Sequence, residues 1–301
     1  MNQATTRTLN VPGAVLTYDV RTNDSSMAPA LLMIGSPMAA AGFATLARHF
    51  TDRTVVTYDP RGVERSTKVE TTAESTPDDH ADDLHRLIAA LGAGAVDIFA
   101  SSGGAVNALA LMARNPEQVR TLVAHEPPAT QALPDRDVAL AVCRAIHATY
   151  RRSGWGAAMA HFIAVVGHKG PFTREYLDQR PPDPAAFGLP TQDDGSRNDP
   201  MLGHNLISCT HYQHDFDALK AVSPRIVIGV GAESEGEMAS RAAHAVARQL
   251  GLTPVTFPSN HGGFLGGEYG QTGNPDDFAA TLREVLTPAQ RASGYSTRDH
   301  A

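Results

Sequence analysis

The sequence predicts an α/β protein in which helices cover both faces of a mostly parallel sheet. Short apolar segments of strand length alternate along the chain with amphipathic segments of helix length, which is the pattern of this class. Two apolar segments, Ala30–Ile34 and Thr54–Tyr58, are uninterrupted, as expected of strands that are buried on both faces. A long insertion between the early and the late strands interrupts the alternation.

The first part of the chain contains three further strands and two helices. Gly13–Val20 alternates between apolar and polar residues, which predicts one strand of a hairpin. Asp79–Leu91 has its apolar residues on one face and is followed by Gly92, which predicts a helix and its end. The next segments are predicted as the strand Val96–Ala100, the helix Gly104–Arg114 and the strand Thr121–Ala124.

The segment 129–220 is predicted to form a helical cap, with the core at 1–128 and 221–301. This cap segment is longer than a crossover needs, and its stretch Arg180–Pro200 is rich in Pro, Asp and Gly. Its helices are predicted at Asp135–Arg152, Gly156–Val166 and Met201–Leu219. The core resumes with the strand Arg225–Val230, the helix Glu235–Leu250, the strand Pro254–Phe257 and the helix Asp276–Leu286.

Composition and charge exclude several classes of partner. The chain has 301 residues, 42% of them hydrophobic, and a net charge of −7 without any basic run. This argues against nucleic acid and membrane surfaces as partners. Neither a signal-peptide pattern nor an apolar run of membrane length is apparent. Cys143 and Cys209 are far apart, as expected of reduced thiols in a cytoplasmic protein. These features carry no prediction of the oligomeric state.

The turn after the strand Val96–Ala100 has the composition of a nucleophile elbow. In such an elbow the residues two positions before and after the nucleophile must be small. Around Ser102 these positions hold Ala100 and Gly104, whereas a turn centred on Ser101 would place the bulky Phe99 there. Ser102 is therefore the candidate nucleophile.

A serine hydroxyl needs a base and an acid partner to act as a nucleophile. His261 follows the late strand Pro254–Phe257 and precedes two glycines, so we expect it to be the base. Two carboxylates compete for the acid position. Glu126 ends the strand after the elbow helix and is followed by two prolines, whereas Glu233 follows the strand Arg225–Val230. Both keep the chain order of nucleophile, acid and histidine, and Glu126 is favoured.

Two backbone amides are candidates for an oxyanion hole. The first is the N–H of Gly103, because it lies directly after Ser102 at the start of a helix. The second is the N–H of Ser36, in the loop after the strand Ala30–Ile34, because the next residue, Pro37, has no N–H.

With these residues in place, the chain resembles the α/β-hydrolase superfamily. The segment Asp59-Pro60-Arg61-Gly62-Val63-Glu64-Arg65-Ser66 is similar to that superfamily's D-x-R-G-x-G-x-S loop, with Glu64 in place of the second glycine. Gly35-Ser36-Pro37 resembles its H-G-x-P oxyanion loop. The resemblance implies an α/β-hydrolase fold with a mostly parallel, eight-stranded sheet and a helical cap insertion.

A closer likeness is to the zearalenone-hydrolase type of lactonase. That type places its acid as a glutamate after strand six in an H-E-x-P setting, which here is His125-Glu126-Pro127-Pro128. The resemblance therefore implies that Glu126 is the acid. It does not extend through the cap segment, where substrate choice is made, so zearalenone itself is not the expected substrate.

These residues predict a serine hydrolase that cleaves a small hydrophobic ester or lactone without metal or cofactor. The same triad would also serve a C–C bond hydrolase or a thioesterase, and a non-catalytic ligand-binding protein could keep the same fold. Four side chains are predicted to line the pocket: Met38, Trp155, His211 and Phe264. A metal site at His211 and His214 is not expected, because no third ligand is apparent.

Overall fold

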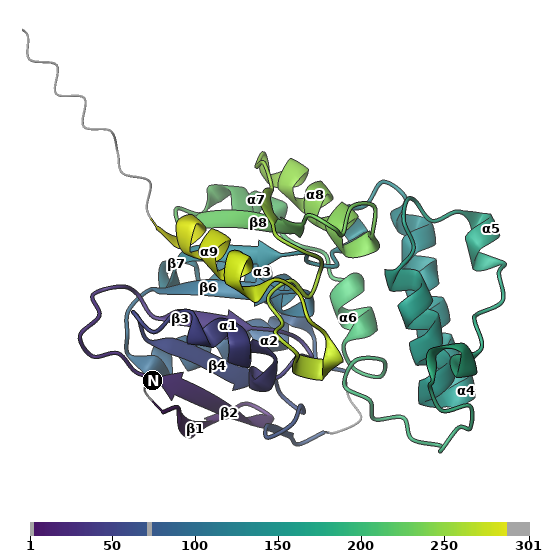
Figure 1. The fold of residues 1–301 in the computed structure, drawn as a ribbon, viewed down its shortest axis with the longest axis horizontal. Helices are drawn as coiled ribbons and strands as arrows, with labels where there is room; N and C mark the ends of the chain where they lie inside the picture. Colours follow the sequence, from purple (N-terminus) through teal and green to yellow (C-terminus); the bar gives the residue numbers. More distant parts are fainter. Residues whose placement is uncertain (1–2, 71–73, 288–301) are drawn as a thin grey trace, which may run out of the picture.

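The computed structural model describes residues 3–70 and 74–287. Its centre is a single sheet with the strand order β1-β2-β4-β3-β6-β7-β8-β9, and the short strand β5 pairs with β2 (Figure 1). The strands are β1 (Thr5–Val11), β2 (Ala14–Arg21), β3 (Leu31–Ile34), β4 (Val55–Asp59), β5 (Thr67–Lys68), β6 (Val96–Ser101), β7 (Val119–His125), β8 (Arg225–Gly231) and β9 (Val255–Phe257).

The direction of the strands sets where a site can form. β1 and β2 form an antiparallel hairpin, and β2 pairs antiparallel with β4. All pairings from β4 through β3, β6, β7 and β8 to β9 are parallel. The carboxyl ends of these six strands therefore meet at one edge of the sheet, where ligands bind in open α/β folds. The predicted fold class is confirmed.

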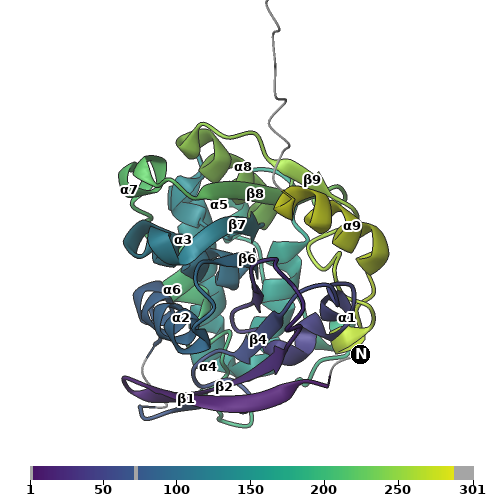
Figure 2. The same ribbon diagram turned by 90° about the vertical axis from the view of Figure 1, so that its left-hand side faces the viewer.

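Helices cover both faces of the sheet, as predicted (Figure 2). The strands alternate between two buried clusters: Leu32 and Ile34 pack with α2, α3 and α8 on one face, and Leu31 and Met33 pack with α1 and α9 on the other. These helices are α1 (Ala44–Arg48), α2 (Pro77–Leu91), α3 (Gly103–Arg114), α8 (Met238–Leu250) and α9 (Pro275–Leu286). Short 3₁₀ helices lie at Ala40–Phe43, Pro116–Gln118, Thr130–Ala132, Pro184–Phe187 and Glu268–Gly270.

Helix α2 shows how local sequence sets a boundary. It begins at Pro77, two residues before the predicted start, because Thr76 and Asp79 form a capping box. The helix ends at Gly92, which takes the left-handed conformation, as the sequence predicts.

The cap segment lies between β7 and β8 and stands beside the sheet (Figure 1). Its elements are α4 (Arg136–Val166), α5 (Arg174–Leu177), α6 (Leu206–Thr210) and α7 (Phe216–Ala221). The two helices predicted at its start form α4, which is interrupted at Gly154, where φ is 80°. Side chains of α4 and α6 build a separate buried cluster, which Met238 and Ala242 of α8 join.

The helix predicted over Met201–Leu219 is wrong as a continuous element. Turns occupy the residues before Leu206, and the chain leaves helical hydrogen bonding between α6 and α7. The break has a local cause, because the Asp215 side chain accepts a hydrogen bond from the Ala218 N–H and starts a new helix. Leu219 of α7 is buried with α3 and α8, so this last turn packs on the core. The domain boundaries themselves stay a prediction, and residues 288–301 of the predicted core lie outside the described residues.

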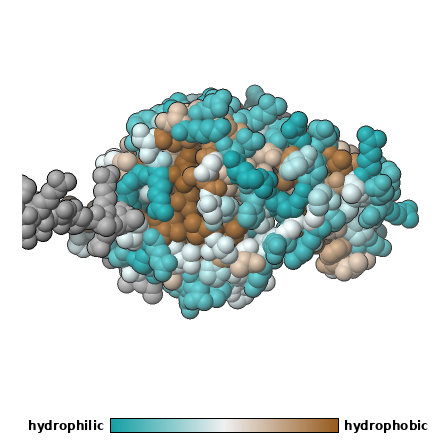
Figure 3. Space-filling model, turned by 90° about the horizontal axis from the view of Figure 1, so that it is seen from above, coloured by the Kyte–Doolittle hydropathy of each residue, from teal (hydrophilic) through white to brown (hydrophobic). Residues whose placement is uncertain are grey.

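The molecular surface is polar over much of the face seen in Figure 3, with its largest apolar area at the end that carries the sheet and smaller ones toward the opposite end. Within residues 3–70 and 74–287, no helix combines the length and the apolar character that crossing a membrane requires.

Candidate active site

Ser102 occupies a strained turn between β6 and α3. Its backbone has φ 56° and ψ −129°, a region that residues other than glycine rarely adopt. The Ser102 N–H donates to the His125 carbonyl at 3.0 Å, which anchors the turn to the neighbouring strand β7. Ser101 is buried at 1% exposure, whereas Ser102 is partly exposed. The turn therefore presents Ser102 rather than Ser101 at the carboxyl edge of the sheet.

The small residues around Ser102 are required by close packing. A methyl group added at Gly104 would lie 2.7 Å from the Gly35 Cα and 2.7 Å from the Ile34 carbonyl oxygen. Only glycine therefore lets α3 approach the loop after β3 this closely. Ala100, in the other small position, is fully buried in the core.

The structure brings Glu126 and His261 into direct contact across 135 residues of sequence. The His261 Nδ1 lies 2.6 Å from Glu126 Oε2, and the other carboxylate oxygen accepts the Gly231 N–H at 2.8 Å. Glu126 follows β7 directly and has a φ of 46°. Strained backbone of this kind is kept where the surroundings fix it and is frequent at functional sites.

Glu126 is completely buried, and its surroundings favour the charged form. Burial by itself would raise the pKa of this carboxyl group. The hydrogen bond to His261 and the positive charge of protonated His261, together with the Gly231 N–H, outweigh burial and hold the Glu126 pKa below its usual value. The carboxylate can therefore orient the imidazole through Nδ1, which leaves Nε2 as the nitrogen that can accept a proton.

Glu233, the alternative acid, has a different environment. Its side chain is exposed, and its carboxylate accepts a weak hydrogen bond from the Ser259 hydroxyl at 3.5 Å. Of the two candidate acids, Glu126 is therefore the one that contacts His261.

His125 precedes Glu126 and lies in an aromatic environment. Its ring is 5.3 Å from that of Phe278, 5.6 Å from that of Phe257 and 6.1 Å from that of His261. Neither ring nitrogen has a hydrogen-bond partner among the described residues. Burial lowers the His125 pKa to about 4, so the imidazole is neutral near pH 7.

The two candidate oxyanion donors are adjacent. A methyl group on Gly103 would collide with the Ser36 carbonyl oxygen, so the loop after β3 lies directly against the start of α3. Within the described part of the chain, neither the Gly103 N–H nor the Ser36 N–H has a hydrogen-bond partner. Both amides can therefore receive a ligand oxygen.

Ser102, Gly103, Ser36 and His261 line one cavity of about 400 Å³. The apolar part of its wall comes mainly from the cap segment and the start of α8, with Phe162, Val166, Met201, Leu206 and Met238. This is a size and composition typical of small-molecule sites.

The four side chains predicted to line the pocket are not among the residues that form this cavity. Phe264 is buried at 2% exposure in the cluster that one face of the sheet forms with α1 and α9, and Met38 packs against that cluster. Trp155 packs in the cap and donates to Asp199 at 3.0 Å. The His211 ring pairs with Arg144 at 3.1 Å. The prediction was based on residue type alone, whereas the contacts of these four side chains hold them outside the cavity wall.

Sequence reasoning missed several polar residues of the cavity wall, among them Asn205 and Glu237. Burial and the nearby Glu126 carboxylate raise the pKa of Glu237. Asn205 is buried and contacts Ser36, which lies far away in the sequence. No motif marks either residue, so sequence alone carried no signal for them.

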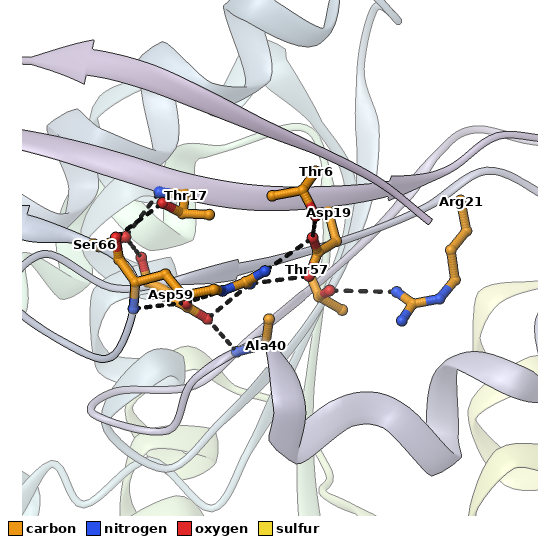
Figure 4. A network of polar contacts seen from close by, with 9 residues as sticks. Thr6, Thr17, Asp19, Arg21, Ala40, Thr57, Asp59 and Ser66 are labelled. Carbon is orange, nitrogen blue, oxygen red and sulfur yellow. Dashed lines mark hydrogen bonds and ion pairs between the residues drawn. The ribbon is translucent and has the colours of Figure 1, made fainter. Parts of the chain in front are cut away.

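The loop after β4 is held by a polar network (Figure 4). The Asp59 carboxylate accepts from the Ala40 N–H at 2.9 Å and from Arg65 Nε at 2.6 Å, and Arg65 also pairs with Asp19. The Ser66 hydroxyl donates to the Asp59 carbonyl at 2.6 Å and accepts from the Thr17 N–H. These contacts fix the loop to β2 and to the segment that follows Ser36.

Fold and site geometry together are those of the α/β-hydrolase class, and comparison with known proteins agrees. A family model for the α/β-hydrolase fold matches residues 29–142. The Bacillus subtilis (strain 168) protein described as uncharacterized hydrolase YraK is 30% identical over 263 residues, which are 85% of this chain and 89% of that relative. The chain belongs to the α/β-hydrolase family.

Solved structures with different activities share this fold. The enol-lactonase from Burkholderia xenovorans LB400 has a TM-score of 0.65 and 16% identity, covering 93% of this chain and 99% of that one. A thermophilic esterase from Thermogutta terrifontis has a TM-score of 0.63 and 21% identity, covering 94% and 98%. Identities this low show a common fold alone. The likeness to the zearalenone-hydrolase type of lactonase stays a prediction.

Proposed function

We propose that the protein is a serine hydrolase that cleaves a carboxylic ester or a lactone through an acyl-enzyme on Ser102. The observation that carries the proposal is the 2.6 Å contact between Glu126 and His261, made at a cavity that His261 and Ser102 both line. The description of the Bacillus subtilis relative as a hydrolase is consistent with this class of reaction.

In the first half of the reaction, Ser102 attacks the substrate carbonyl carbon. His261 Nε2 takes the hydroxyl proton as the new C–O bond forms, and the carbonyl electron pair moves onto oxygen. Glu126 holds Nδ1–H and stabilises the imidazolium. The amides of Gly103 and Ser36 donate hydrogen bonds to the oxyanion, which carries a full charge only after attack.

In the second half, the tetrahedral intermediate collapses and the bond to the leaving oxygen breaks. The leaving alkoxide takes the proton from His261 Nε2, and the acyl group stays on Ser102. A water molecule that His261 deprotonates then attacks the acyl carbon, the bond from this carbon to Ser102 Oγ breaks, and His261 returns the proton to Ser102 as the acid leaves. With a lactone, the acid and the alcohol leave as one molecule.

The cavity wall supports a small hydrophobic substrate. Apolar side chains such as Phe162, Leu206 and Met238 would remove the acyl or alcohol group from water. The wall also contains the polar residues Ser36, Ser102 and His261, and the reacting carbonyl would lie against these.

The test is turnover of a panel of aryl esters, lactones and thioesters by the wild type and by two neighbouring serine variants. We expect ester or lactone turnover, with a loss of at least about 10³-fold in Ser102→Ala. Ser101→Ala is the matched control, because Ser101 is buried one position away, and it should keep most of the activity. Turnover that survives in Ser102→Ala, or a wild type that acts on none of these substrates, would refute the proposal.

A further inference from the structure

One side chain of the cap segment reaches the loop that carries Ser36. Asn205 lies directly before α6, and its Nδ2 donates to the Ser36 hydroxyl oxygen at 2.6 Å. The Cys209 thiol in turn donates to Asn205 Oδ1 at 2.7 Å. All three side chains are buried, with exposures of 5% for Ser36, 7% for Asn205 and 3% for Cys209. They form a continuous hydrogen-bonded chain from the cap to the core.

Helix α6 presents Asn205 and Cys209 on the same side. The Cys209 N–H donates to the Asn205 carbonyl at 2.9 Å, which places the two side chains one turn apart. Burial raises the Cys209 pKa to about 12, so the thiol keeps its proton and acts as the donor. Because Asn205 Oδ1 accepts this proton, the amide is oriented with its NH₂ group toward Ser36.

The side chains of Asn205 and Cys209 also lie against Gly103, the other candidate oxyanion donor. A methyl group on Gly103 would lie 3.2 Å from Asn205 Oδ1 and 3.3 Å from Cys209 Sγ. Helix α6 also contacts α3, which begins at Gly103, and it contacts α4 of the cap. Asn205 and Cys209 therefore lie beside both Ser36 and Gly103, at the place where the cap meets the nucleophile turn.

We infer that Asn205 is a positioning residue that holds the Ser36 loop in the geometry that stabilises the oxyanion, and that Cys209 fixes the orientation of its amide. The inference rests on the proposed function. The Ser36 N–H belongs to a loop, and among the described residues Asn205 supplies the side-chain hydrogen bond that joins this loop to the cap. A donor displaced by a fraction of an ångström stabilises the charge that develops on oxygen less well.

This role has a kinetic signature. Asn205 acts on a group that is needed after attack has begun, so its loss should lower kcat and leave KM almost unchanged. Removing an oxyanion donor outright costs about 10² to 10³-fold, and misplacing one should cost less. We expect about a 10- to 100-fold loss of kcat in Asn205→Ala.

The experiment compares four variants with an aryl ester as substrate and an aryl trifluoromethyl ketone as a probe of the tetrahedral state. Asn205→Ala should lower kcat and weaken the affinity for the ketone by similar factors. Cys209→Ala should have a smaller effect in the same direction, whereas Cys209→Ser, which keeps a donor, should recover most of the loss. Ser208→Ala is the matched control, because Ser208 lies on the same helix and its hydroxyl donates to the carbonyls of His204 and Asn205.

A KM effect alone, an equal loss in Ser208→Ala, or no difference between the two Cys209 variants would overturn the inference. If Asn205→Ala fails to fold, the Cys209 pair still decides, since Ala and Ser differ by one hydroxyl group. Failure of the proposed function looks different: the wild type itself would then neither hydrolyse the ester nor bind the ketone.

Discussion

The two sides of the candidate site are built differently. The acid–histidine side comes entirely from the core, since Glu126 follows β7, Gly231 ends β8 and His261 follows β9, and these strands are parallel neighbours in the sheet. The oxyanion side begins in the core with Ser36 but is completed by Asn205 of the cap segment. Proton transfer should therefore depend on the sheet alone, whereas oxyanion stabilisation and substrate fit should depend also on how the cap packs.

The largest effect is expected when the acid is neutralised on the core side. Glu126→Gln should lower kcat by about 10³ to 10⁴-fold, because an amide cannot stabilise the imidazolium and can favour the wrong tautomer. Steady-state turnover of an aryl ester measures this. Glu233→Gln is the matched control and should change turnover by less than about twofold, since Glu233 is exposed and contacts Ser259 instead. The reverse pattern would assign the acid to Glu233.

The stability of the core should depend strongly on the buried ion pair between Arg61, in the loop after β4, and Asp83 of α2. Arg61 holds Asp83 with two hydrogen bonds of 2.6 and 2.7 Å, and Asp83 is fully buried. Asp83→Asn leaves the guanidinium without its charged partner and should lower the free energy of unfolding by about 3–5 kcal/mol. Urea unfolding measures the change. Asp82→Asn breaks an exposed pair with Arg86 and should cost much less; equal costs would contradict this account.

Acid should destabilise the core through His125. Its pKa is about 4 in the folded protein against an ordinary pKa of 6.5 for histidine, so the unfolded chain binds more protons between these values. The free energy of unfolding should therefore fall by about 3 kcal/mol as the pH drops through this window, with no further loss from this group below it.

His125→Phe should remove that part of the pH dependence, because a phenyl ring fits the aromatic surroundings and does not titrate. Unfolding free energies measured at several pH values give the slope. His244→Phe, which changes an exposed histidine on α8, is the control. An unchanged slope in His125→Phe would show that His125 does not carry the effect.

The smallest effect is expected on the cap side, where substrate fit is set. Phe162→Ala should raise KM for a long-chain ester by about tenfold, because a ring that lines the cavity is lost. The kcat value should change little, since Phe162 supplies no group to the proposed proton transfer. Comparison of short- and long-chain esters separates lost contact from misfolding: equal losses for both would argue against a role in substrate fit.

The sequence predicted best what depends on neighbouring residues. Local composition predicts the strands, the tight turn at Ser102 and helix α2, and the structure confirms the fold. Glu126 and His261 could be proposed as partners because both follow predicted parallel strands, whose ends must meet. The structure brings them within hydrogen-bond distance, while their catalytic role stays a proposal.

Other features could not be inferred from local patterns. Asn205 and Ser36 are 169 residues apart, and nothing in either neighbourhood indicates the contact. The prediction of one helix over Met201–Leu219 did not account for Asp215, whose side chain caps the N-terminus of α7 and so begins a separate helix. Pocket residues were chosen by size and polarity, yet Trp155 and Phe264 are held by packing away from the cavity.

The central claim is that Ser102 is a nucleophile activated by His261 and Glu126. Its most direct test is labelling with a fluorophosphonate, followed by peptide mass spectrometry of the folded protein. The account predicts one adduct, on Ser102, that forms much more slowly in Glu126→Gln and at the wild-type rate in Glu233→Gln. An adduct on another residue, no adduct on the folded wild type, or a rate that does not change in Glu126→Gln would contradict it.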